Sequence, residues 1–174
     1  MLRTYCYLCA ATLEKVSNSS WWCPSCKYTQ YENPRPCVEL IVFHKNKILI
    51  CERGREPSKG SYDMPGGFIE VNETIEQALN REVEEELSLV PSNYSEPQYF
   101  ASYYMQYPFG KEVYNNLISV FMVNLLADPS AVKPNDDVAS VKWIELSDVS
   151  EVNWASFIHL QNAEHALKRV RVRR

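Results

Sequence analysis

The sequence has no long apolar run, no internal repeat and no low-complexity tract. None of its 174 residues lies in a stretch that approaches the roughly 18 apolar residues of a membrane-spanning helix. We therefore expect no membrane association. The first ten residues, MLRTYCYLCA, also lack the apolar segment of a signal peptide, and we expect a cytoplasmic protein.

Six cysteines do not indicate a secreted disulfide scaffold in this chain. A length of 174 residues with 45% hydrophobic content supports a core that needs no disulfides, and it fits one domain with a small appendage. Two of the cysteines, Cys37 and Cys51, fall in apolar segments and are expected to be buried, inert thiols.

The other four cysteines form two close pairs. The C-x2-C pairs Cys6–Cys9 and Cys23–Cys26 are separated by 13 residues. Four thiolates suit tetrahedral Zn²⁺, and a site with four protein ligands is structural. A redox-active pair is the alternative, but no βαβ pattern surrounds these cysteines. We expect a zinc ribbon over residues 1–35 that depends on its metal, because about 35 residues cannot form a self-sufficient core.

The predicted ribbon is poor in positive charge. Ahead of Tyr31 the only basic residues are Arg3, Lys15 and Lys27. Modules that bind RNA usually combine basic patches with aromatic side chains. We therefore do not expect nucleic acid as a partner, although the basic C-terminal residues 169–174 leave contact with RNA open.

Negative charge is concentrated in one stretch. Between Glu70 and Glu86 there are seven glutamates and one arginine, a net charge of −6 in a chain whose net charge is −4. Apolar residues at spacings of three and four predict a helix over residues 74–88. They are Ile75, Ala78, Leu79, Val83 and Leu87.

Three of these glutamates fall on one side of the predicted helix. Glu82, Glu85 and Glu86 lie within an arc of roughly 100° that borders the apolar side, whereas Glu84 points away. Like charges at this spacing repel, and partial burial raises the cost. Mg²⁺ or Mn²⁺, which prefer oxygen ligands, would relieve the repulsion. A solvated acidic face is the alternative.

This stretch resembles the Nudix box, G-x5-E-x7-R-E-U-x-E-E-x-G-U, in which U is aliphatic. Eight of the nine specified positions match over 23 residues, namely Gly67, Glu73, Arg81, Glu82, Val83, Glu85, Glu86 and Leu89. Ser88 stands where the box has glycine. That glycine is expected to be a helix C-cap, so the departure concerns the end of the helix and not the metal ligands.

The resemblance implies a hydrolase that cleaves the pyrophosphate bond of a nucleoside diphosphate linked to another group. It implies that Glu82 and Glu86 are the principal ligands of Mg²⁺ or Mn²⁺, and that Glu85 and the Gly66 carbonyl complete the set. Arg81 would orient the glutamates through charge-assisted hydrogen bonds. Such metal ions lower the pKa of the attacking water and neutralise the charge of the diphosphate.

Residues outside the box extend the candidate site. Asp137 falls where relatives place a further acidic ligand or base, and a turn-capping role is the alternative. The sequence leaves open whether Glu82 or Asp137 accepts the proton. Arg53 and Arg55 are candidates to bind the diphosphate, with a solvated loop as the alternative. Tyr107 is expected either to stack on a purine or to pack.

A ribbon joined to a Nudix domain by the N-P-x-P segment at residues 33–36 resembles one branch of this family. That branch includes the NADH pyrophosphatases and relatives that act on ADP-ribose or flavin dinucleotides. Residues 106–110, QYPFG, match only the middle of the motif S-Q-P-W-P-F-P-x-S, which puts a preference for NADH in doubt. We expect a small nucleotide of the NADH, ADP-ribose or FAD type as substrate. An RNA cap hydrolase of the NAD type, and a non-catalytic nucleotide sensor or nucleic-acid-binding protein, are the alternatives.

The implied fold is α/β: a Nudix α/β/α sandwich with a mixed β-sheet over residues 36–174, preceded by the zinc ribbon. A homodimer is one possible assembly. We predict a hairpin of strands at residues 37–44 and 47–52, an extended segment at 98–109, a strand through the sheet centre at 113–126, and a last helix from Asn153 to Lys168. His159 and His165 on this helix are expected to pack or to lie at the surface.

Overall fold

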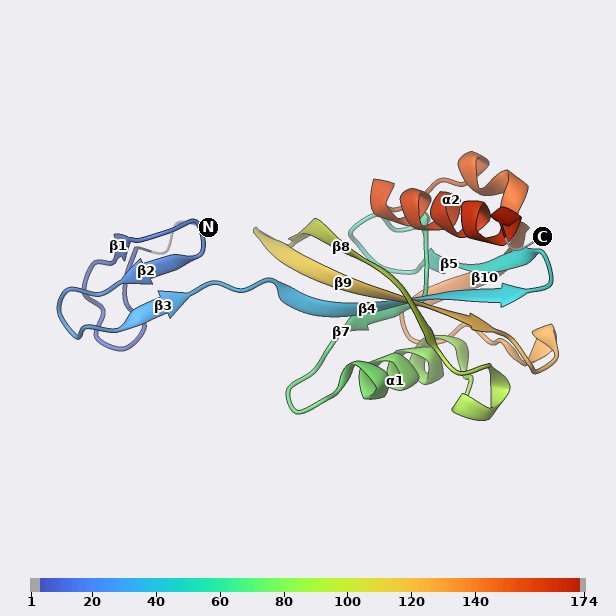
Figure 1. Ribbon diagram of the computed structural model, residues 1–174, viewed down its shortest axis with the longest axis horizontal. Coiled ribbons are helices and arrows are strands. Elements are labelled where there is room, and N and C mark those ends of the chain that lie inside the picture. The colour runs from blue at the N-terminus through green and yellow to red at the C-terminus, as the bar shows by residue number, and fades with distance from the viewer. Residues whose placement is uncertain (1–3, 173–174) are drawn as a thin grey trace.

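The computed structural model describes residues 4–172 and contains two β-sheets joined by an extended segment (Figure 1). The smaller sheet is antiparallel in the order β1 (Glu14–Lys15), β2 (Ser20–Trp22), β3 (Thr29–Tyr31). The side chains of the basic C-terminal residues 169–174 lie outside the described part. Within residues 4–172, no helix is long and apolar enough to cross a membrane.

The larger sheet has seven strands and mixed pairing. Its order is β10-β5-β4-β9-β8, with β6 paired to β5 and β7 paired to β4. Only the β4–β9 pair is parallel among the described strands. The strands are β4 (Arg35–His44), β5 (Lys47–Arg53), β6 (Tyr62–Asp63), β7 (Gly66–Phe68), β8 (Gln98–Phe109), β9 (Glu112–Asn124) and β10 (Val138–Glu145). The predicted hairpin is confirmed, and the strand near 113–126 is an interior one, between β4 and β8, although the strand at the centre of the sheet is β4.

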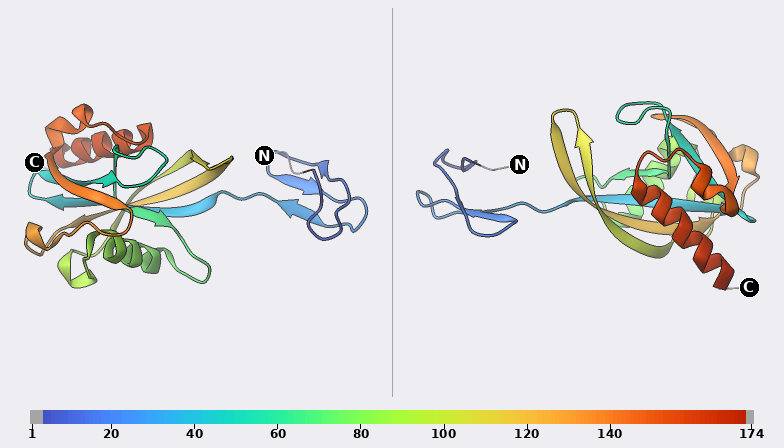
Figure 2. Two further views of the ribbon diagram at one scale, coloured as in Figure 1. Left: turned by 180° about the vertical axis from the view of Figure 1, so that it is seen from behind. Right: turned by 90° about the horizontal axis from the view of Figure 1, so that it is seen from above.

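Helices α1 (Ile75–Leu87) and α2 (Phe157–Val172) cover opposite faces of this sheet (Figures 1 and 2). Alternation along β4 supplies both cores. Val38, Leu40 and Val42 pack in the cluster that contains Leu79 and Val83 of α1. The intervening residues Cys37, Ile41 and Phe43 pack in the cluster that contains Ala163 and Ala166 of α2. The predicted α/β/α sandwich is therefore confirmed, and Cys37 and Cys51 are buried free thiols.

Local sequence sets both ends of α1. Thr74 is the N-cap: its hydroxyl accepts a hydrogen bond from the Gln77 backbone N–H, and the Gln77 side chain accepts one from the Thr74 N–H. The helix ends at Ser88, whose φ of 57° and ψ of 30° place it in the left-handed region. The residue that departs from the box is therefore the C-cap, as the resemblance implied.

We expect Ser88→Gly to raise the free energy of unfolding by about 0.5 kcal/mol. The left-handed conformation costs an L-residue about 1–2 kcal/mol, and the greater freedom of glycine in the unfolded chain offsets part of the gain. Ser88→Val should destabilise instead, since a β-branched side chain tolerates this conformation poorly. Urea denaturation of the three proteins measures the difference. Equal stability of the Gly and Val variants would contradict this account.

The last helix begins later than predicted. It starts at Phe157, not at Asn153. Residues 153–155 instead pair with the short strand β6: the Tyr62 N–H donates to the Asn153 carbonyl (2.9 Å), and the Ala155 N–H donates to the Tyr62 carbonyl (2.7 Å). These backbone groups are therefore satisfied by a segment about 90 residues away, which local helix signals do not report.

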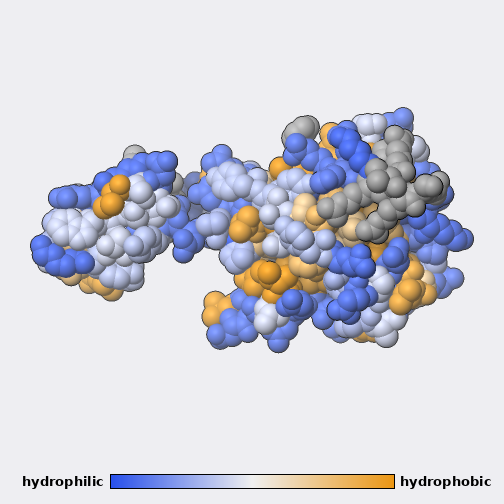
Figure 3. All heavy atoms as spheres, in the orientation of Figure 1, coloured by the Kyte–Doolittle hydropathy of each residue, from blue (hydrophilic) through white to orange (hydrophobic). Residues whose placement is uncertain are grey.

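The central strands diverge from each other at one end. Pairing between β4 and β5 is confined to residues 43–44 and 47–48. Beyond this point β7 pairs with the free edge of β4, and β6 pairs with the free edge of β5. The sheet is thus split between β6 and β7. On the face shown in Figure 3, the largest apolar area lies where the sheet meets α1.

Candidate active site

A cavity of about 410 Å³ lies at the split in the sheet. Glu82 and Glu86 of α1 line it, and so does His159 of α2, so the cavity reaches both faces of the sheet. Strand residues between these helices, among them Glu39, Arg53 and Gly66, complete its wall. Pockets of this size hold small-molecule ligands.

Glu86 is a buried carboxylate in the wall of this cavity. It is only 8% exposed, and one carboxylate oxygen accepts a hydrogen bond from the Gly66 N–H at 2.9 Å. Burial, together with nearby Glu82, Asp63 and Asp137, raises the pKa of Glu86 well above its usual value. Burial also raises the pKa of Glu82. Anionic carboxylates in this position need a positive partner.

The glycine at position 67 is required by the close approach of Glu82. A Cβ atom placed on Gly67 would overlap the Glu82 carboxylate. A larger residue would therefore push this carboxylate out of place. Gly67 also pairs with Val38 between β7 and β4, so the strand itself cannot retreat without breaking the ladder.

Arg81 connects three glutamates of the box. Its guanidinium donates to both oxygens of Glu73 (2.8 and 3.0 Å), to Glu82 (2.8 Å), to Glu85 (3.0 Å) and to the Phe68 carbonyl (2.9 Å). The hydrogen bonds from Arg81 lower the pKa of Glu73. Glu73 thereby fixes the loop before α1, since it also accepts from the Glu70 N–H. Arg81 holds Glu82 in the cavity wall.

Some of the residues predicted for the site line the cavity, and others lie outside its lining. Glu85 bonds to Arg81 and is not among the described residues that line the cavity. Arg53 lines the cavity, whereas Arg55 is exposed and donates to Asp136 at 2.9 Å. Asp137 lines the cavity beside them. Its backbone carbonyl accepts a hydrogen bond from the Gly54 N–H at 2.7 Å, which holds Asp137 against the end of β5.

Arg53 joins three parts of the wall. Its guanidinium donates to Asp63 (2.6 Å), to the Pro57 carbonyl (2.8 Å) and to the hydroxyl of Tyr107 (3.2 Å). Tyr107 also lies edge-on to Phe68, with ring centroids 6.5 Å apart. The aromatic side chain and the cation predicted as binding residues therefore share one side of the cavity.

Sequence reasoning missed a buried polar group under α2. Glu39 accepts a hydrogen bond from Asn162 at 2.6 Å and pairs with His159 at 3.1 Å. Burial alone would lower the pKa of His159, but Glu39 and Asp63 outweigh it and raise this pKa. His159 is thus a buried cavity residue and not a surface one. A signal existed: Glu39 is the one charged residue inside the apolar run CVELIVF.

The donors in the cavity fit a hard divalent cation. Seven carboxylate side chains line it, against two guanidinium groups and one imidazole. In the described part of the chain, neither Glu86 nor Asp137 has an ion pair, while Glu39, Asp63 and Glu82 do. Oxygen ligands with unbalanced negative charge suit Mg²⁺ or Mn²⁺.

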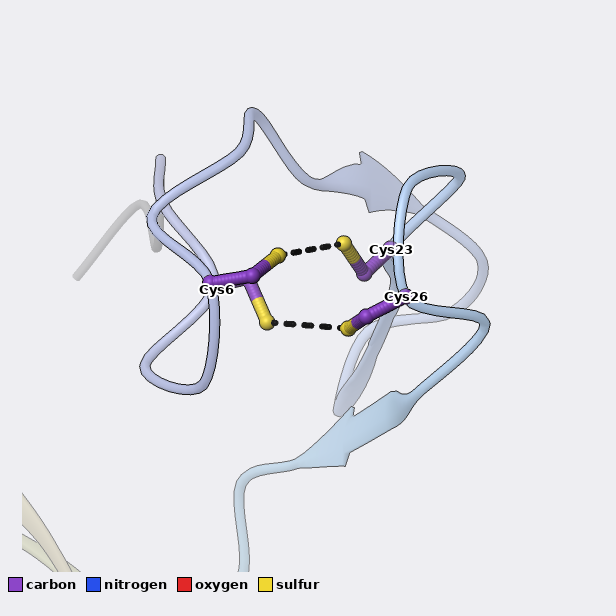
Figure 4. A group of neighbouring side chains, drawn as sticks. Cys6, Cys23 and Cys26 are labelled. Atoms are coloured by element: carbon purple, nitrogen blue, oxygen red, sulfur yellow. Dashed lines mark hydrogen bonds between the residues drawn. The ribbon is translucent and has the colours of Figure 1, made fainter.

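The four N-terminal cysteines converge as predicted. Their sulfur atoms lie within 4.8 Å of one another, and no other group of three or more potential ligands among residues 4–172 is as tightly gathered. Cys6 and Cys26 are 3.7 Å apart and Cys9 and Cys23 are 3.5 Å apart. Figure 4 shows the side chains of Cys6, Cys23 and Cys26 pointing toward one another. The Cys26 backbone N–H is the largest cause that lowers the pKa of Cys23 to about 7, whereas burial and the three neighbouring thiols raise the pKa of Cys26 to about 12.

The chain resembles curated relatives of two kinds. It is 45% identical to an ADP-ribose pyrophosphatase of Methanocaldococcus jannaschii over 65 residues, which cover 37% of this chain and 38% of the relative. It is 30% identical to the NAD-capped RNA hydrolase NudC of Vibrio atlanticus over 152 residues, which cover 86% of this chain and 51% of NudC. The chain thus spans about half, or less, of the length of these relatives.

A solved structure has the same fold. The NUDIX domain of Shewanella oneidensis NrtR, complexed with ADP ribose, superposes with a TM-score of 0.65 at 24% identity, covering 80% of this chain and 90% of that one. Residues 33–164 match the family described as NUDIX domain. This range contains α1 and the cavity wall described above. The chain therefore belongs to the Nudix family.

Proposed function

We propose that this protein is a divalent-metal-dependent pyrophosphohydrolase that acts on a nucleoside diphosphate linked to a second group. One observation carries the proposal: Glu82, Glu86 and Asp137 line the same cavity as Arg53 and Tyr107. Carboxylates for metal ions, a cation for phosphate and an aromatic ring for a base are thus within one ligand-sized space. We also propose that residues 1–35 and 36–174 are separate domains.

Glu82 and Glu86 are the proposed principal ligands of Mg²⁺ or Mn²⁺, with the Gly66 carbonyl, and Asp137 is a further candidate. When bound, the metal supplies charge neutralisation at the diphosphate and a lower pKa for a water nucleophile. Glu85 accepts a hydrogen bond from Arg81 and stays a candidate third ligand. Arg81 is a positioning residue, because it acts through Glu82 and Glu73.

Phosphate binding and proton transfer are the roles proposed for the other side chains of the cavity. Arg53 is proposed to bind the diphosphate; its guanidinium is fixed by Asp63 and Pro57 and therefore loses little entropy on binding. Glu82 or Asp137 is the candidate to accept the proton from water. Arg55 lies outside the cavity lining and keeps only a supporting role through Asp136.

Hydrolysis assays with Mg²⁺ or Mn²⁺ test this proposal. The panel comprises NADH, NAD⁺, ADP-ribose, FAD, ADP-glucose and deoxynucleoside triphosphates, with Glu86→Gln as the blank. If the proposed function is correct, one linked diphosphate is hydrolysed much faster than the other compounds. A folded, zinc-loaded protein that cleaves none of them would refute hydrolysis of small linked nucleotides, and would favour either a nucleotide-sensing role or hydrolysis of capped RNA.

A second candidate is hydrolysis of an NAD-type cap on RNA. The observation in its favour is the 30% identity to NudC over 86% of the chain. Against it stands the low basic content ahead of Tyr31. NAD-capped RNA and free NAD⁺ distinguish the two candidates. A preference for capped RNA that weakens steeply with salt would support the second candidate.

We expect Tyr107→Ala to raise KM for the preferred substrate by about tenfold with little change in kcat. The ring lines the cavity, and its hydroxyl bonds to Arg53 and not to a proposed metal ligand. We therefore expect its stacking to contribute binding energy of about 1–3 kcal/mol that is the same before and during reaction. Steady-state kinetics measures this split. Tyr99→Ala is the control, because Tyr99 is exposed on the edge strand. An unchanged KM would assign Tyr107 to packing alone.

A further inference from the structure

The cavity has a part on the α2 side of the sheet that the proposed metal site does not use. We call this part the α2-side lobe; its wall is formed by Cys37, Met105, Tyr107, Asn116 and Ile118. Strand pairing places these side chains together: Cys37 is opposite Ile118, and Met105 is opposite Asn116. Cys37 and Ile118 pack in the core cluster that contains residues of α2, so this group of side chains lies on the α2 face of the sheet.

The amide oxygen of Asn116 is a buried hydrogen-bond acceptor in this lobe. Asn116 is 3% exposed, and its amide oxygen has no hydrogen bond among the described residues. Three other buried side-chain atoms share this condition, on Ser156, His159 and Asn162. Of these three residues only His159 lines the cavity, and its atom lies 3.1 Å from Glu39. An unpaired buried acceptor costs about 1–3 kcal/mol.

The surroundings of Asn116 define what it could bind. Sulfur, aliphatic and aromatic side chains form a wall that suits the faces of a flat ring. The acceptor at Asn116 requires an N–H donor at the edge of that ring. An amide also offers its own N–H, so it can pair with a donor and an acceptor side by side, as asparagine does with adenine.

We propose that Asn116 is a specificity-determining residue that binds the exocyclic amino group of a flat heteroaromatic ring of the substrate. Adenine and the carboxamide of nicotinamide both present this group. The inference rests on the proposed function for the identity of the site, and it names the substrate end that enters the α2-side lobe. The diphosphate then extends toward Arg53 and the carboxylates of α1, which line the same cavity.

Equilibrium binding of mononucleotides, measured by calorimetry, tests this inference without any need for turnover. AMP is compared with IMP, in which a carbonyl replaces the amino group. Nicotinamide mononucleotide is compared with nicotinic acid mononucleotide, in which a carboxylate replaces the carboxamide. For the pair that uses the lobe, we expect the aminated ligand to bind at least about tenfold more tightly, the value of one net hydrogen bond left unmade.

Asn116→Leu should reduce that preference to less than about threefold, because leucine has a similar volume and no acceptor. Asn115→Leu is the matched control: Asn115 precedes it on β9, and its amide oxygen accepts from the Tyr104 hydroxyl, which lies outside the cavity lining. Comparison of each ligand pair between variants removes the effect of the extra charge on nicotinic acid mononucleotide.

The outcomes separate the two proposals. An Asn116-dependent preference for AMP places the adenine end in the lobe, and one for nicotinamide mononucleotide places the nicotinamide end there. A preference that persists in Asn116→Leu, or the absence of any preference, overturns the inference even if hydrolysis is found. An Asn116-dependent preference without hydrolysis of any substrate keeps the inference and refutes the proposed function.

Discussion

Glu86→Gln is expected to lower kcat/KM by at least about 10³-fold while the fold stays intact, since both charge stabilisation and metal binding are lost. Glutamine keeps the shape and an acceptor oxygen for the Gly66 N–H, which lies 2.9 Å from the carboxylate. It removes the negative charge. Steady-state hydrolysis of the preferred dinucleotide measures the loss.

Glu86→Gln is not expected to destabilise the metal-free protein. Glu86 is buried beside Glu82, Asp63 and Asp137, so its charge is destabilising without a cation. We expect the metal-free Tm of Glu86→Gln to equal or exceed that of the wild type, and the rise in Tm on addition of Mn²⁺ to disappear. Glu84→Gln, exposed on the same helix, is the control. Activity close to wild type in Glu86→Gln would remove Glu86 from the proposed metal ligands.

Cys23→Ser is expected to abolish zinc binding and unfold the N-terminal module. Cys23 is fully buried, and its sulfur is one of four that lie within 4.8 Å of one another. Among residues 4–172, the other members of the buried cluster there are Cys6, Leu13 and Trp21. So small a core cannot offset the conformational entropy of about 30 residues, and metal binding supplies the missing free energy.

Elemental analysis should find about one zinc per chain in the wild type and almost none in Cys23→Ser. Limited proteolysis should then cleave the variant ahead of β4 and leave the Nudix domain whole. Cys51→Ala is the control, because Cys51 lies in β5, away from the cluster. Full zinc content in Cys23→Ser would refute the four-cysteine site.

Sequence patterns alone predicted the parts of this protein that depend on neighbours along the chain. The spacing of Cys6, Cys9, Cys23 and Cys26 predicted their convergence, because two short turns suffice to bring each pair to one metal. The periodicity of the box predicted α1, and the missing glycine predicted a C-cap at Ser88. Helical spacing predicted that Glu82, Glu85 and Glu86 share one side of α1. Glu82 and Glu86 line the cavity, whereas Glu85 is exposed.

Tertiary structure alone decided which residues share the cavity. Glu39, Arg53, Asn116 and His159 come from four elements spread over 120 residues, and strand pairing and helix docking bring them together. Arg53 and Arg55 are equivalent in the sequence, yet only the first lines the cavity, because β5 ends there and the chain turns away.

Strand register is the physical reason why the sequence alone does not specify which residues line the cavity. Neighbouring side chains on a strand point to opposite faces, so a shift of one residue would exchange Asn116 for Asn115 in the lobe. The sequence specifies that β9 is a strand, but only its pairing with β4 and β8 specifies which of these two asparagines is buried against the cavity. The family and the acidic helix were therefore determined by the sequence, and the substrate-facing surface by the tertiary structure.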